Sequence, residues 1–137
     1  MERWQRSLRD AIRDPEIPAR RFHLSAEELR RVTDAFPFQV TQYYFSLIRE
    51  KDDPIYRQCI PDARELAPCS DLMDDPLGEE ALSPAPNVVR RYPDHCLLLV
   101  SGFCATYCRF CTRKRKFAGG CPGIDASMKR IRQGIDW

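Results

Sequence analysis

Three closely spaced cysteines constrain this chain more than any other feature. They lie in the stretch Cys104-Ala-Thr-Tyr-Cys108-Arg-Phe-Cys111, which has the spacing C-x3-C-x2-C. Three thiolates on so short a loop can ligate one metal centre from one side and leave a coordination position open. An open position is typical of a centre that takes part in chemistry, whereas four protein ligands suit a structural or electron-transfer site. The spacing therefore predicts a metal-binding loop at Cys104, Cys108 and Cys111.

Two kinds of metal centre fit these residues. Zinc accepts thiolate and imidazole ligands, and Cys121, Cys96 or His95 could supply the fourth. Zinc sites usually take cysteines in two separated pairs, and the sequence has no second C-x2-C pair, so an iron–sulfur centre is favoured. A disulfide framework fits poorly, because seven is an odd number of cysteines and no secretory segment precedes them. The cysteines at 59, 69 and 96 are predicted to be packing residues.

Composition excludes several classes of partner. A net charge of +2, with basic residues spread along the chain apart from the run Arg113–Lys116, argues against nucleic acid binding. No apolar stretch approaches the length of a membrane span, and Cys96–Val100 is only long enough for a strand. A polar amino terminus argues against a signal peptide, and seven thiols indicate a reducing compartment. These features predict a cytoplasmic protein that contacts neither nucleic acid nor membrane.

Helical signals dominate the first part of the chain. A helix is predicted over residues 3–13, ended by Pro15 and Pro18. A capping box at Ser25–Glu28 begins a second helix that runs to about Ala35. A third is predicted over residues 41–48 with Thr41 as its cap, and Pro54 suits the first position of another. Five prolines between residues 61 and 86 predict an extended segment.

Strand signals follow this segment. Residues 88–91 and 96–100 are predicted strands, and the second is apolar enough to be buried on both faces. A last helix is predicted from about Asp125 or Ser127, with a buried face at spacings of three and four formed by Met128, Ile131 and Ile135. A buried strand, a loop and a helix form the opening unit of an α/β barrel or sheet, whose parallel neighbours are missing. We therefore expect residues 1–86 to be a helical and extended lead-in and residues 87–137 to start a barrel in a longer protein.

Several stretches, taken in order, resemble the lysine 2,3-aminomutase family of radical S-adenosylmethionine (SAM) enzymes, over its amino-terminal portion only. They are Phe36–Ile48, Asp53–Pro61, Asp75–Gly78, Arg91–Asp94 and the cysteine stretch ending in Cys111-Thr-Arg-Lys-Arg115. Each stretch alone is weak evidence for the family, but all of them in this order are highly specific for it. The resemblance implies an α/β fold in which a helical segment leads into the first β-α unit of a radical SAM partial (β/α) barrel, truncated.

The resemblance also implies a reaction and its cofactors. Cys104, Cys108 and Cys111 match the ligands of a [4Fe–4S] cluster whose fourth iron binds SAM, and Phe110 matches an aromatic position near the SAM adenine. The family cleaves SAM to a 5′-deoxyadenosyl radical, which takes a hydrogen from an amino acid held on pyridoxal 5′-phosphate (PLP). The amino group then moves from C2 to C3. The cofactors carry the difficult chemistry, while the protein positions them.

The resemblance implies binding roles for three further residues. Arg91 and Tyr92 match family positions near the PLP, where a guanidinium suits a phosphate or phenolate oxygen. Arg113 matches a residue that holds the substrate carboxylate, for which a bidentate fork is well shaped. His95 departs from the arginine common at its place. Family members are typically homo-oligomers that act on small amino acids.

Alternative functions stay open at this point. The substrate could be glutamate or arginine instead of lysine, because the pocket for the substrate side chain lies later in the family's sequence. The PLP-binding lysine also lies later, so the chain alone is expected to be inactive. A third alternative is a small zinc or iron–sulfur module that acts through binding.

Overall fold

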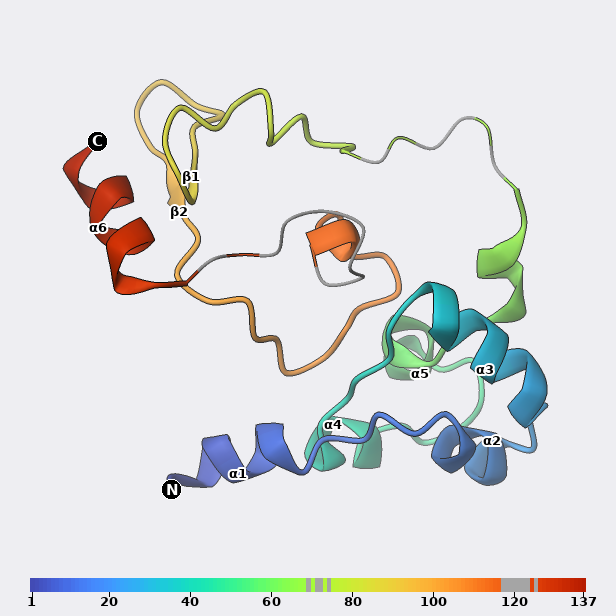
Figure 1. Ribbon diagram of the computed structural model, residues 1–137. Helices are drawn as coiled ribbons and strands as arrows, with labels where there is room; N and C mark the ends of the chain where they lie inside the picture. Colours follow the sequence, from blue (N-terminus) through green and yellow to red (C-terminus); the bar gives the residue numbers. More distant parts are fainter. Residues whose placement is uncertain (69, 71–72, 74, 117–123, 125) are drawn as a thin grey trace. The chain divides into compact units, whose positions relative to one another are not determined.

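The computed structural model describes residues 1–68, 70, 73, 75–116, 124 and 126–137 (Figure 1). Within these residues the chain is α/β, with six α-helices, two short 3-10 helices and one two-stranded sheet. It divides into two compact units, residues 1–69 with 104–114 and residues 70–103 with 115–137. The cysteine loop, residues 104–111, therefore belongs to the same unit as the amino-terminal helices. A domain boundary at residue 86 stays a prediction.

The first unit is built from short helices, and side-chain caps set the starts of α3 (Ala26–Ala35), α4 (Gln42–Ser46) and α5 (Pro54–Cys59). Ser25 Oγ accepts a hydrogen bond from Glu28 N at 3.3 Å, and Thr41 Oγ1 accepts one from Tyr44 N at 3.3 Å, which confirms both predicted caps. Pro54 occupies the first turn of its helix, as predicted. The unit also contains α1 (Arg3–Arg9) and α2 (Glu16–Phe22), and η1 (Ala63–Leu66) follows α5. A second 3-10 helix, η2 (Lys114–Lys116), begins at the last residue of this unit.

Helix α2 corrects the prediction that Pro15 and Pro18 only end a preceding helix. Pro15 is the N-cap of α2 and Pro18 lies in its first turn, where a missing backbone N–H costs no helical hydrogen bond. The first helix ends at Arg9, earlier than predicted. The chain then becomes extended, and Ile12 pairs with Val40 through backbone hydrogen bonds of 2.8 and 3.0 Å.

The core of the first unit surrounds the extended segment Phe38–Val40, all of whose residues are buried. Its apolar side chains pack with those of α4 and α5, and Phe22 makes edge-on contacts with two of the core rings, Phe45 and Tyr56. Burial of such a cluster is the main source of stability for helices this short. The buried cluster consists of Ile12, Phe38, Val40, Phe45, Ile48, Tyr56, Cys59 and Ile60.

The second unit contains an antiparallel pair of strands and one helix. Strand β1 (Val88–Val89) pairs with β2 (Leu97–Leu98), with Val88 opposite Leu98. Helix α6 (Met128–Asp136) starts after Ser127, one of the two predicted starting points. Ser127 caps it by accepting a hydrogen bond from Arg130 N at 3.4 Å, and α6 lies beside the strands (Figure 1). Helix α6 comes close to β2 at Gly134, where a Cβ atom would lie 2.6 Å from Leu98 Cδ1.

Two burial predictions for this unit are wrong. Leu97 and Val100 are exposed, although the strand at 96–100 was predicted to be buried on both faces. Met128 and Ile135 are exposed as well, and α6 approaches the sheet through Gly134. An apolar pattern identifies residues suited to burial, but the described residues supply one partner strand and one helix to cover them. In the described part of the chain, no helix has the length and apolar character needed to cross a membrane.

Candidate functional site

The cysteine loop holds three free thiols in half-buried positions. Cys104 Sγ donates to Thr106 O at 3.0 Å, and Cys108 Sγ lies 3.9 Å from the same oxygen. Cys111 follows one turn later, where its N–H donates to Cys108 O at 3.1 Å. The loop therefore brings two of its sulfurs to one carbonyl oxygen and the third to the adjacent turn.

Burial sets the protonation of the middle cysteine. It raises the pKa of the Cys108 thiol, and the neighbouring Cys104 and Cys111 raise it further, because a second negative charge nearby is unfavourable. A bound cation reverses this preference by stabilising thiolates. Among the described residues, no three histidine, cysteine, aspartate or glutamate side chains form a ready-made metal site. The donor set thus fits a thiolate-ligated centre by its chemistry.

The backbone of the loop is fixed to the core segment of the first unit. Tyr107 N donates to Gln39 O at 2.8 Å, next to a β-bridge between Thr106 and Val40. The buried Gln39 side chain also donates from Nε2 to Cys104 O at 2.5 Å. Arg109 N donates to Gln58 O of α5 at 2.8 Å. Each gap between cysteines is therefore pinned by at least one backbone hydrogen bond.

The Arg109 side chain makes the most extensive contact between the loop and the helices. Its guanidinium donates to both carboxylate oxygens of Glu65, with Nε–Oε1 at 2.9 Å and Nη2–Oε2 at 2.8 Å. It also donates to Pro37 O at 3.0 Å and Phe36 O at 3.3 Å. The Arg109 and Glu65 side chains are only 7% and 17% exposed, so the pair is shielded from solvent screening.

Lys114, three residues after Cys111, also contacts Glu65. Its Nζ donates to Glu65 Oε2 at 2.7 Å and to Arg109 O at 3.3 Å, and it lies 3.9 Å from the centre of the Phe36 ring. Burial opposes ionisation of Glu65, but hydrogen bonds from Arg109 and Lys114 outweigh it and hold the pKa of the carboxyl below its ordinary value. We call Glu65, Arg109 and Lys114 the loop anchor.

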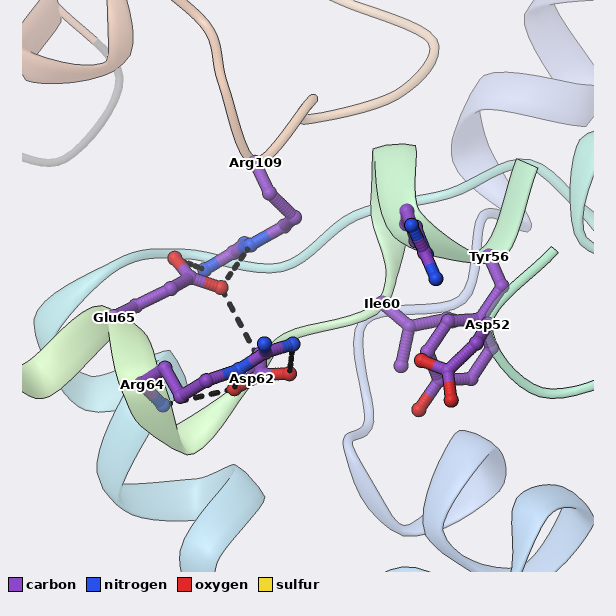
Figure 2. Close-up of a pocket in the computed structure, with 8 residues that line it drawn as sticks. Asp52, Tyr56, Ile60, Asp62, Arg64, Glu65 and Arg109 are labelled. Carbon is purple, nitrogen blue, oxygen red and sulfur yellow. Dashed lines mark hydrogen bonds and ion pairs between the residues drawn. The ribbon is translucent and has the colours of Figure 1, made fainter. Parts of the chain in front are cut away.

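A cavity of about 350 Å³ lies beside the loop anchor, and Figure 2 shows Glu65 and Arg109 on one side of it. The charged groups in its wall are largely paired, because Arg64 donates to Asp62 at 2.7 Å as Arg109 does to Glu65. Among the described residues, no cysteine lines this cavity. The remaining lining includes Asp52, Tyr56, Arg57 and Ile60.

The other predicted site residues lie in different settings. Phe110 is 68% exposed between two half-buried cysteines, and Arg113 is half-buried after the third. Arg91 and Tyr92 are exposed in the second unit, on the turn that joins β1 to β2. The Tyr92 ring stacks on His95 with ring centres 4.6 Å apart.

The remaining cysteines follow the packing prediction only in part. Cys59 is fully buried, which confirms the prediction for that residue, but Cys96 is exposed, which does not. Cys69 and Cys121 lie outside the described residues. Cys96 and His95 are neighbours in the second unit, where the His95 Nδ1 contacts Asp94 Oδ1 at 2.7 Å.

Sequence reasoning missed the loop anchor. The spacing of Asp62 and Glu65 was a readable signal, because it is that of a capping box, and Glu65 Oε1 does accept the Asp62 N–H at 3.0 Å. Nothing in the sequence pairs Glu65 with Arg109, since 44 positions separate them.

Comparison with known proteins gives a consistent set of relatives. No protein-family model matches the chain. It is 40% identical to the L-lysine 2,3-aminomutase of Methanococcus maripaludis, over 80% of this chain and 26% of the relative. It is 38% identical to the L-lysine 2,3-aminomutase of Clostridium subterminale, over 98% of this chain and 33% of the relative. It is 35% identical to the glutamate 2,3-aminomutase of Clostridioides difficile, over 98% of this chain and 32% of the relative. The chain thus spans about a quarter to a third of the length of these curated relatives.

Proposed function

Because the chain belongs to the lysine 2,3-aminomutase family, we propose that it supplies the cluster-binding loop of a radical SAM, PLP-dependent amino acid 2,3-aminomutase. The observation that carries the proposal is the arrangement of Cys104, Cys108 and Cys111. They are free, half-buried thiols on a loop whose intervening backbone is pinned to the helical unit. Three thiols on a loop whose backbone is fixed in this way suit a centre that keeps one position open.

The remaining site residues have roles that follow from their chemistry. When bound, the cluster and SAM supply one-electron chemistry for hydrogen abstraction, and PLP supplies a conjugated ring for the substrate's amino group. The exposed ring of Phe110 offers a flat apolar surface next to the proposed ligands, suited to an adenine. Arg113 offers a guanidinium fork to a substrate carboxylate, and Arg91 offers one to a phosphate. Tyr92 offers an exposed hydroxyl beside Arg91.

L-lysine is the substrate that we propose, because the two relatives named for it are 40% and 38% identical to this chain, against 35% for the glutamate enzyme. Glutamate is the second candidate, supported by the similarity to a glutamate 2,3-aminomutase over 98% of this chain. An enzyme for lysine must hold a cationic side chain, whereas an enzyme for glutamate must hold an anionic one. Competition between the two amino acids for the complete enzyme distinguishes them.

Metal analysis tests the cluster proposal. The chain is loaded anaerobically with iron and sulfide, and separately with zinc, and the metal per chain is measured for wild type and for Cys104→Ser, Cys108→Ser and Cys111→Ser. We expect the wild type to hold about four irons with visible absorption, and each variant to lose most of it. Cys96→Ser is the matched control, because Cys96 is an exposed cysteine outside the loop. Tight zinc binding without iron uptake would instead favour a zinc module.

A further inference from the structure

Glu65 lies at the centre of the contacts that determine where the third cysteine lies. It accepts hydrogen bonds from Arg109, two residues before Cys111, and from Lys114, three residues after it. Both cations therefore reach the same carboxylate from opposite sides of Cys111. A bidentate guanidinium contact fixes orientation as well as distance, so the segment between these two residues has little freedom to move.

Glu65 also makes a contact that does not involve the loop. Its Oε1 accepts the Asp62 N–H at 3.0 Å, which ties the side chain to the start of η1. Its side chain is 17% exposed and is surrounded by the Arg109 fork, Lys114 and the first turn of η1. This extra contact restricts the Glu65 side chain, so less conformational entropy is lost when the carboxylate binds Arg109 and Lys114.

We propose that Glu65 is a positioning residue that orders the segment from Arg109 to Lys114 before any metal binds, so that Cys111 and Cys108 are presented in a nearly fixed place. This inference rests on the proposed function for its importance, but its structural content concerns the metal-free chain. Its consequence is that removing the Glu65 charge loosens Cys108 and Cys111 more than Cys104. The backbone at Cys104 is held separately, by Gln39.

Thiol alkylation of the metal-free full chain tests whether Glu65 orders the segment from Arg109 to Lys114. Iodoacetamide is the probe, and peptide mass spectrometry gives the rate at each cysteine. Exposed Cys96 reports the intrinsic reactivity, and buried Cys59 reports opening of the whole first unit. Glu65→Gln retains the size of the side chain but removes the charge shared by two cations. We expect alkylation of Cys108 and Cys111, relative to Cys96, to rise by about fivefold or more, and by a larger factor than at Cys59, because local opening of the loop adds to any loss of global stability.

Glu16→Gln is the matched control. Glu16 also pairs with two cations within the first unit, Arg30 and Arg20, but it makes no contact with the loop among the described interactions. We expect it to leave all relative alkylation rates unchanged. Lys114→Gln is the second variant, because Lys114 lies at the edge of the loop anchor and its loss disturbs packing less. We expect it to raise the rate at Cys111 and to leave Cys104 near the wild-type rate.

Iron retention gives a second readout. After anaerobic loading, release of iron to a chelator is expected to be several-fold faster from Glu65→Gln than from Glu16→Gln, since a looser loop opens more often. Equal alkylation of Cys108 and Cys111 in Glu65→Gln and wild type would overturn the positioning role. So would a parallel rise at Cys59, which indicates general unfolding. Failure of wild type to bind iron would count against the proposed function, and the alkylation pattern would still decide the role of Glu65.

Discussion

Arg109 donates two hydrogen bonds to Glu65, at 2.9 and 2.8 Å, and thereby joins the middle of the cysteine loop to η1 across 44 positions of sequence. Arg109 lies directly after Cys108 and its side chain turns away from solvent toward the helices. The loop thus uses its intervening residues for attachment. Its thiols are left for other partners.

Breaking this pair is expected to destabilise the first unit. Arg109→Met leaves Glu65 partly buried with one cation, so we expect a loss of about 3 kcal/mol in the free energy of unfolding. The double variant Arg109→Met/Glu65→Leu is expected to recover part of that loss, because no unpaired charge remains. Urea unfolding of the single and double variants measures the coupling. Additive losses would contradict a direct interaction.

Acid is expected to weaken the loop anchor through Glu65. The pKa of Glu65 is lower in the folded chain than in the unfolded one, so its stabilising contribution is full above the unfolded pKa of about 4.3. The contribution is lost as the pH falls through the lower folded pKa. Asp62 behaves likewise, since its hydrogen bonds with Arg64 lower its pKa to about 2. Urea unfolding between about pH 6 and pH 2 should show a smaller acid-induced loss in Glu65→Gln than in wild type. Equal losses would contradict this assignment.

Some features of the fold and of the candidate site could be predicted from the sequence, and others could not, for physical reasons. The caps Ser25 and Thr41 and the motif C-x3-C-x2-C were predictable, because each depends on residues within a few positions. The pairing of Glu65 with Arg109 was not, because a buried fork depends on which distant segments meet.

The same distinction explains the errors over burial. Leu97 and Ile135 lie in patterns that signal burial, but their exposure depends on which elements cover them. Helix α2 was missed because a proline in a first turn resembles a proline that ends a helix.

Arg21 is expected to stabilise the end of α4. Its guanidinium donates to Phe45 O at 2.9 Å and to Ile48 O at 2.5 Å, and lies 4.6 Å from the centre of the Phe45 ring. Arg21→Lys cannot reproduce this fork, so we expect a loss of about 1–2 kcal/mol in unfolding free energy. Arg20→Lys is the control, since Arg20 makes only an exposed ion pair with Glu16 at 3.8 Å. Similar losses in both variants would contradict a specific role for Arg21.

Gly134 is expected to resist even the smallest substitution. Alanine normally favours a helix over glycine, but here its Cβ would lie 2.6 Å from Leu98 Cδ1 and 3.0 Å from Pro86 O. We expect Gly134→Ala to cost about 1–3 kcal/mol and to move α6 away from the strands. Amide hydrogen exchange at Val88 and Leu98 measures the change, with exposed Gln133→Ala as the control. Unchanged or slower exchange in Gly134→Ala would contradict the close packing.

We propose that Cys104, Cys108 and Cys111 bind a cluster that keeps one position open. Electron paramagnetic resonance of the iron-loaded, reduced chain, recorded with and without SAM, tests it most directly. We expect a cluster signal that changes when SAM is added and that is lost in Cys108→Ser but retained in Cys96→Ser. A signal that is insensitive to SAM, or one that persists without Cys108, would contradict it.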